Sequence, residues 1–139
     1  SFRLFPLLTV AENVMYPMEL RGMKAKDARK RAAALVEQVG LSDSVLHRYP
    51  TMLSGGEQQR VAIARALSMD TRVLLADEPT GNLDTANGAR IFSILQELAH
   101  QKGYCVIVVT HDTGLASQAD QVLELKDGRM VTKGGQTAL

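Results

Sequence analysis

The sequence predicts an α/β fold built around two parallel strands, and three observations lead to this prediction. Two short apolar runs, 73–76 (VLLA) and 106–109 (VIVV), show no polar alternation, which favours buried strands covered on both faces of a sheet. The segment between them, 85–102, carries apolar residues at helical spacing. A strand, a helix and a second strand form a right-handed βαβ unit, so the strands should be parallel.

Further helices are predicted on the N-terminal side of these strands. Residues 24–39 are rich in good helix formers and end before Gly40, which fits a glycine C-cap. A second helix should run from Ser54 to about Met69, because Ser54 and Glu57 fit the N-cap and N3 positions of a capping box. The first stretch, 2–22, is interrupted by prolines, although Thr9 fits the cap of a further helix.

The C-terminal part predicts an antiparallel ribbon. Two apolar segments, 122–125 and 130–132, flank the pair Asp127-Gly128. An Asp-Gly pair between such segments is a strong signal for a tight hairpin turn.

Composition limits the possible partners. The chain has 139 residues, of which 45% are hydrophobic, and this suffices for one globular domain. Its net charge of +1 provides no general attraction for nucleic acid, and aromatic residues, at 4%, are too few for a platform that stacks bases. No apolar run is long enough to span a bilayer, so any membrane function requires another subunit. The single cysteine, Cys105, cannot form an internal disulfide, which fits a reducing cytoplasm.

Polar residues follow both predicted strands at one edge of the sheet, where ligands of open α/β sheets bind. Asp77 is our candidate for Mg²⁺, and Glu78 for polarising an attacking water. His111, after the second strand, is a candidate for contacting a γ-phosphate. An isolated Asp-Glu pair would more often mark a strand that reaches solvent. The second strand ending in histidine and the nearby glycine pair favour a functional site.

The glycine pair at the predicted start of the second helix can be explained in two ways. Gly55 and Gly56 let backbone N–H groups approach an anion, and Ser54 can donate its hydroxyl to a phosphate oxygen. The same segment, taken alone, is an ordinary capping box. Asp84 is similarly ambiguous: it fits a helix cap, yet it lies only a few residues beyond Glu78.

These motifs resemble those of the ATP-binding cassette (ABC) ATPases. Residues 53–58 (LSGGEQ) resemble the family signature, 73–78 (VLLADE) its Walker B strand, 82–84 (NLD) its D-loop and 110–112 (THD) its switch histidine. The resemblance implies the C-terminal part of a P-loop NTPase fold of the ABC type. It places a helical signature subdomain at about 1–70, and an α/β core with a terminal hairpin at about 71–139. Residues 76–84 and 4–14 look most like the bacterial subgroup that serves lipoprotein release, macrolide export and antimicrobial-peptide resistance.

The resemblance also implies roles, cofactors and partners. In the family, two cassettes pair head to tail around ATP and Mg²⁺, so the signature residues would contact the partner's nucleotide: Ser54, Gly55, Gly56 and Gln58. The chain's own nucleotide would be served by Asp77, Glu78 and His111, with Asp84 in the D-loop. The expected partners are a second, identical cassette and transmembrane permease subunits, which residues 5–18 would contact on the inner face of the plasma membrane. No nucleic acid is expected.

The sequence lacks several features that the resemblance leads one to expect, among them the aromatic residue that would stack on adenine and the glutamine of the Q-loop. It contains no Gly-x-x-x-x-Gly-Lys-[Ser/Thr] segment, the loop that cradles the phosphates. We therefore expect a truncated chain that alone binds ATP poorly and does not hydrolyse it. Two alternatives to a transport ATPase stay open: a soluble cassette protein acting in translation or DNA repair, and an inert dimerisation fragment.

Overall fold

The structure, a computed structural model, describes residues 4–131. Val109 ends the first of two compact units, and Thr110 begins the second. The first unit contains the predicted helices and the parallel strands, and the second contains the predicted hairpin.

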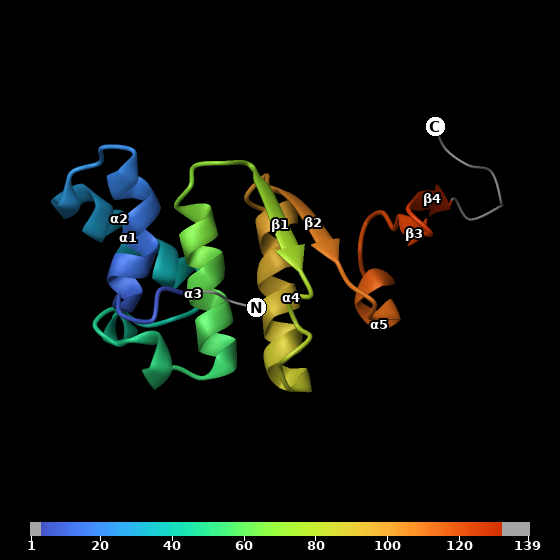
Figure 1. Cartoon of the computed structure of the whole chain (residues 1–139), viewed down its shortest axis with the longest axis horizontal. Coiled ribbons are helices and arrows are strands. Elements are labelled where there is room, and N and C mark those ends of the chain that lie inside the picture. The colour runs from blue at the N-terminus through green and yellow to red at the C-terminus, as the bar shows by residue number, and fades with distance from the viewer. Residues whose placement is uncertain (1–3, 132–139) are drawn as a thin grey trace. The chain divides into compact units, whose positions relative to one another are not determined.

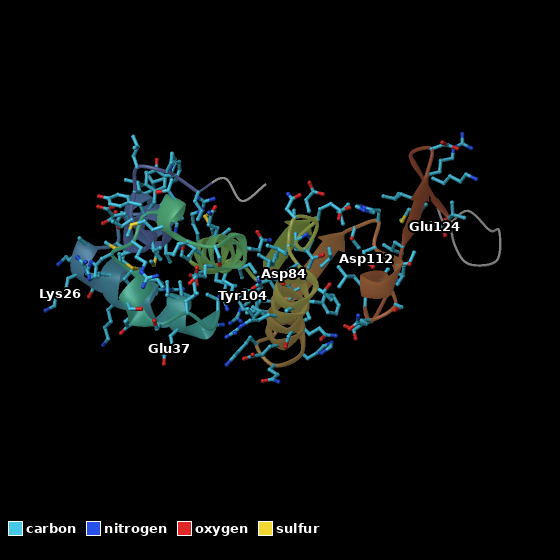
Figure 2. All side chains as sticks on the ribbon, turned by 90° about the horizontal axis from the view of Figure 1, so that it is seen from below. Lys26, Glu37, Asp84, Tyr104, Asp112 and Glu124 are labelled. Atoms are coloured by element: carbon cyan, nitrogen blue, oxygen red, sulfur yellow. The ribbon has the colours of Figure 1, made fainter. Side chains whose placement is uncertain are left out.

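Three helices form the N-terminal part of the first unit (Figure 1). They are α1 (Val10–Leu20), α2 (Ala25–Gln38) and α3 (Gly55–Leu67), and two short 3-10 turns, η1 (Asp43–Val45) and η2 (Pro50–Met52), connect the last two. Figure 2 shows the charged side chains of Lys26 and Glu37 on α2 pointing away from the group of helices. The apolar faces of the three helices pack against one another and supply most of the core.

Capping boxes start two of these helices, as the sequence predicts. The Thr9 backbone N–H donates to Glu12 Oε2 at 2.7 Å, and the Ser54 N–H donates to Glu57 Oε2 at 2.8 Å. Pro17 does not interrupt the first helix but lies inside α1. Burial of Val10, Val14 and Met18 on the same helix offsets the backbone hydrogen bond that proline cannot donate.

The α/β part of the first unit has the predicted order of strand, helix and strand. β1 (Val73–Asp77) pairs in parallel with β2 (Cys105–Val109), and α4 (Thr85–His100) connects them. The register aligns Val73 with Cys105 and Asp77 with Val109, so both strands end at one edge (Figure 1). The parallel pairing is confirmed.

The prediction that both faces of these strands are covered is wrong for the residues that the structure describes. Leu74 is buried and packs into the core, whereas its neighbour Leu75 is 73% exposed. Successive side chains of a strand point to opposite faces. One face therefore packs on helices, and the other leaves Val73, Leu75, Ile107 and Val109 exposed within residues 4–131.

Asn13 is a buried polar residue of α1 that fixes the segment before the helix. Its Oδ1 accepts the Phe5 backbone N–H at 2.8 Å, and its Nδ2 lies within 3.1 Å of the carbonyl oxygens of Phe5, Leu8 and Thr9. The side chain is fully buried, so these contacts replace water completely. Asn13 therefore fixes the backbone of Phe5.

Replacing this amide should cost stability. We expect Asn13→Ala to lower the free energy of unfolding by about 1–3 kcal/mol, because the Phe5 N–H and the carbonyls lose their partner. The measurement is urea denaturation of the complete gene product that carries this sequence, with the exposed Gln38→Ala as the control. Equal denaturation midpoints for the two variants would contradict this role of Asn13.

The second unit contains α5 (Thr113–Ala116) and the predicted ribbon of β3 (Glu124–Lys126) and β4 (Arg129–Val131). Asp127 and Gly128 both have positive φ angles, 51° and 75°, as a two-residue hairpin turn of type I′ requires. The hairpin prediction is confirmed, although β3 begins two residues later than expected and Thr132 lies outside the described residues. Within residues 4–131, no helix is both long enough and apolar enough to cross a membrane.

Candidate nucleotide site

The shared edge of β1 and β2 carries the two predicted carboxylates. Asp77 is the last residue of β1 and is exposed, and Glu78 follows it. The Glu78 backbone N–H donates to the Val109 carbonyl at 2.9 Å, which extends the ladder by one bond beyond the strand. The sheet thus fixes the backbone of both acidic residues.

Glu78 also begins a sharp turn. Its φ of 44° lies in the left-handed region, which is uncommon for a residue with a side chain. The Gly81 N–H donates to the Glu78 carbonyl at 3.2 Å and closes the turn, and Pro79 inside it is fully buried. Such backbone strain is often concentrated at functional sites, where the surrounding packing maintains it.

Both carboxylates line an open hollow of about 430 Å³. The hollow is lined by β1 and the turn that follows it, by Leu95 of α4 and by residues of α3: Gln59, Ala62, Ile63 and Ala66. A ligand can therefore reach Asp77 and Glu78 from solvent.

His111 belongs to the second unit, where it is exposed between β2 and α5. The next residue, Asp112, caps α5 by accepting the backbone N–H groups of Gly114 at 2.7 Å and Leu115 at 3.2 Å. Figure 2 labels Asp112 at this helix start. The predicted contact of His111 with a phosphate stays a prediction.

The signature segment has the geometry of a capped helix start. Ser54 Oγ accepts the Glu57 N–H at 3.3 Å, and its own hydroxyl proton can still be donated. The Ser54 N–H, and to a smaller extent the charges of Arg60 and Arg48, hold the pKa of the Glu57 carboxyl below its ordinary value. Gln58 Nε2 donates to the Leu53 carbonyl at 3.1 Å, so its amide folds back over the helix start.

Asp84 is the N-cap of α4, so the capping alternative is observed (Figure 2). Its Oδ1 accepts the Asn87 backbone N–H at 2.9 Å, and its Oδ2 accepts Asn87 Nδ2 at 2.6 Å. These two bonds, the backbone one first, hold the pKa of the Asp84 carboxyl below its ordinary value. The carboxylate is therefore charged and oriented at neutral pH.

The structure brings the signature and the D-loop together. A Cβ placed on Gly55 would lie 3.5 Å from Leu83 Cδ2, and one on Gly56 would lie 2.6 Å from Asn87 Oδ1. Sequence reasoning did not identify Asn87. The pattern Asp84-x-x-Asn87, which fits a side-chain cap, was the available signal.

These features agree with the comparison to known proteins. The sequence pattern that defines the ABC transporter family matches residues 1–81 of the chain. The chain belongs to the ABC transporter family.

Relatives within the ABC transporter family match nearly the whole chain. The lipoprotein-releasing system ATP-binding protein LolD of Syntrophus aciditrophicus is 51% identical over 129 residues, which cover 93% of this chain and 57% of LolD. The macrolide export ATP-binding/permease protein MacB of Brucella melitensis is 46% identical over 132 residues, which cover 95% of this chain and 20% of MacB. The chain thus spans a little over half the length of LolD.

Solved structures give the same result for the fold. A dimeric ATP-binding cassette in a post-hydrolysis state, bound to ADP and Pi, superimposes with a TM-score of 0.81 at 39% identity. The match covers 98% of this chain and 59% of the chain of the solved cassette. The predicted ABC-type α/β fold is confirmed.

Arg60 on α3 is a further residue that the sequence did not single out. It is 8% exposed, and its Nε and Nη1 are buried without an acceptor among the described residues. Burial, followed by the charge of Arg90, lowers the pKa of Arg60, and Glu57 partly opposes this. The helix that begins with the signature therefore carries a buried cationic side chain.

Proposed function

We propose that the complete protein carrying this chain is the ATP-hydrolysing subunit of a bacterial transporter. The observation that supports this most strongly is the pair Asp77 and Glu78, held by the sheet at the rim of an open hollow in a chain of the ABC family. The names of the relatives favour lipoprotein release or export as the process that ATP drives.

Hydrolysis needs a base at the attacking water, and Glu78 is the candidate. Its carboxylate accepts a proton from the water as the water oxygen attacks the γ-phosphorus and the bond to the β-phosphate oxygen breaks. The strained turn at Glu78 fixes the starting point of this side chain. His111 would donate a hydrogen bond to the γ-phosphate and stabilise the charge that develops there.

Asp77 is suited to hold Mg²⁺ together with the phosphates of ATP. No group of three or more His, Cys, Asp or Glu residues within residues 4–131 forms a complete metal site. A single exposed carboxylate suits Mg²⁺, which keeps several waters and takes its other ligands from phosphate oxygens. When bound, the ion neutralises phosphate charge during transfer.

Part of the signature is exposed, and this part is suited to contact with a second copy of the protein. Ser54 and Gly55 are both exposed at the N-terminus of α3, where the helix dipole and backbone N–H groups attract an anion. We assign Ser54, Gly55, Gly56 and Gln58 to the nucleotide of the partner cassette. Asp84, in the neighbouring loop, would face the same interface.

A groove beside α1 is the candidate contact for the permease. It measures about 450 Å³ and lies between α1 and the C-terminal half of α3, lined by Phe5, Tyr16, Pro17, Leu20, Arg21, Ala62, Arg65, Ala66 and Met69. Phe5 and Tyr16 stack edge to face with ring centroids 5.0 Å apart, and the Arg65 guanidinium lies over the Phe5 ring. An apolar floor with two arginines fits a short amphipathic helix that carries a carboxylate. We place the complete protein on the inner face of the membrane through this contact.

Coexpression with a membrane subunit encoded by a neighbouring gene tests this function. We expect the complete gene product to release phosphate from ATP, and the membrane subunit to change that rate. Leu20→Glu, which replaces an apolar side chain of the groove by a carboxylate, should remove most of this response, because the new charge repels the carboxylate of the partner and competes with it for the two arginines.

The matched control is Leu123→Glu, since Leu123 is also exposed and does not line the groove. An equal response to the membrane subunit in both variants would rule out the groove as the contact. Absence of phosphate release from the unaltered protein would rule out the proposed activity itself.

A further inference from the structure

Gly56 is a glycine because of its neighbour rather than its backbone angles. It does not have the positive φ that favours glycine, in contrast to Gly40 or Gly103. A Cβ placed on it would lie 2.6 Å from Oδ1, 2.8 Å from Cγ and 3.2 Å from Cβ of Asn87. Cβ atoms essentially never lie within 3.0 Å of an atom of another residue, so the Asn87 amide occupies the space that a Cβ at position 56 would need.

Asn87 contacts Asp84 through the other end of the same amide. Its Nδ2 donates to Asp84 Oδ2 at 2.6 Å, and its backbone N–H donates to Asp84 Oδ1 at 2.9 Å. Because a carboxylate can only accept, the amide nitrogen must face Asp84 and the oxygen must face Gly56. One side chain therefore contacts both the signature and the D-loop.

Neighbouring contacts support this arrangement. Leu83, next to Asp84, lies in van der Waals range of a Cβ at Gly55. A Cβ on Gly88, next to Asn87, would lie 3.5 Å from Thr80, which belongs to the turn that begins at Glu78. The start of α4 thus lies between the signature helix and the turn that carries the proposed base.

We propose that Asn87 is a positioning residue: it orients the Asp84 carboxylate, and the position of α3 determines that orientation. A nucleotide that fixes the N-terminus of α3 would fix the Asn87 amide and, through it, the Asp84 carboxylate. This inference rests on the proposed ATPase function, because it assigns Asn87 a part in the same reaction.

The experiment compares four forms of the complete gene product: unaltered, Asn87→Ala, Asn87→Ser and Ala86→Gly. Ala86 is the exposed neighbour of Asn87 on α4, so Ala86→Gly weakens the same helix start without changing the amide. We expect Asn87→Ala to lower kcat for ATP about tenfold at unchanged KM, since misplaced groups lose rate more than binding. Asn87→Ser retains a donor for Asp84 and should recover most of the rate, and Ala86→Gly should retain all of it.

Melting temperatures test the contact independently of activity. Gly56→Ala should lower the melting temperature in the unaltered protein and much less in the Asn87→Ala background, because the closest clashing atoms are then absent. Equal shifts in both backgrounds, or equal kcat for Asn87→Ala and Ala86→Gly, would overturn the inference. An unaltered protein that does not hydrolyse ATP would instead overturn the proposed function.

Discussion

Glu78→Gln should reduce ATP turnover by the complete gene product by at least about 100-fold, which is the lower part of the range for losing a general base. Glutamine has nearly the same shape as glutamate, but it cannot accept a proton from water. Nucleotide binding should persist, because Glu78 is assigned to the water rather than to the phosphates. The measurements are steady-state phosphate release and the dissociation constant for ATP.

The matched control for this variant is Glu97→Gln, which makes the same chemical change at an exposed position of α4. Its turnover should equal that of the unaltered protein. If Glu78→Gln hydrolysed ATP at the unaltered rate, Glu78 would not be the base.

Leu98→Ala should lower the free energy of unfolding by about 2–5 kcal/mol, the range for removing a buried leucine side chain. Leu98 is 2% exposed and belongs to the core that joins α4 to the helices and strands of the first unit. The lost stability has two parts: the transfer free energy of the removed methyl and methylene groups, and the cost of the cavity that they leave behind. Urea denaturation of the complete gene product measures it as a shift of the midpoint.

Leu7→Ala provides the comparison, because Leu7 is 86% exposed. It should change the free energy of unfolding by no more than about 0.5 kcal/mol. A small shift for Leu98→Ala, equal to that of Leu7→Ala, would contradict the assignment of Leu98 to the core.

Local sequence signals predicted most elements of this fold. The capping boxes at Thr9 and Ser54, and the turn at Asp127 and Gly128, depend on residues within four positions of one another. The parallel pairing followed from a connection rule that constrains two apolar runs separated by a helix. Such short-range physics can be recognised without knowing the rest of the fold.

Features that depend on distant neighbours were not predictable in this way. The exposure of Leu75 depends on what packs against the sheet, and an apolar run does not report that. Asn87 looked like an ordinary helix residue, because its contact with Gly56 joins positions that are far apart in the sequence. The left-handed backbone of Glu78 likewise arises from the turn and the bond to Val109.

The mass in solution of the complete Glu78→Gln protein, measured by light scattering with and without ATP and Mg²⁺, tests the shared nucleotide site most directly. If the signature of each copy contacts the ATP of the other, blocked hydrolysis should trap a dimer when ATP is present and leave a monomer when ATP is removed. A protein that stayed monomeric at saturating ATP would contradict a site built from two copies.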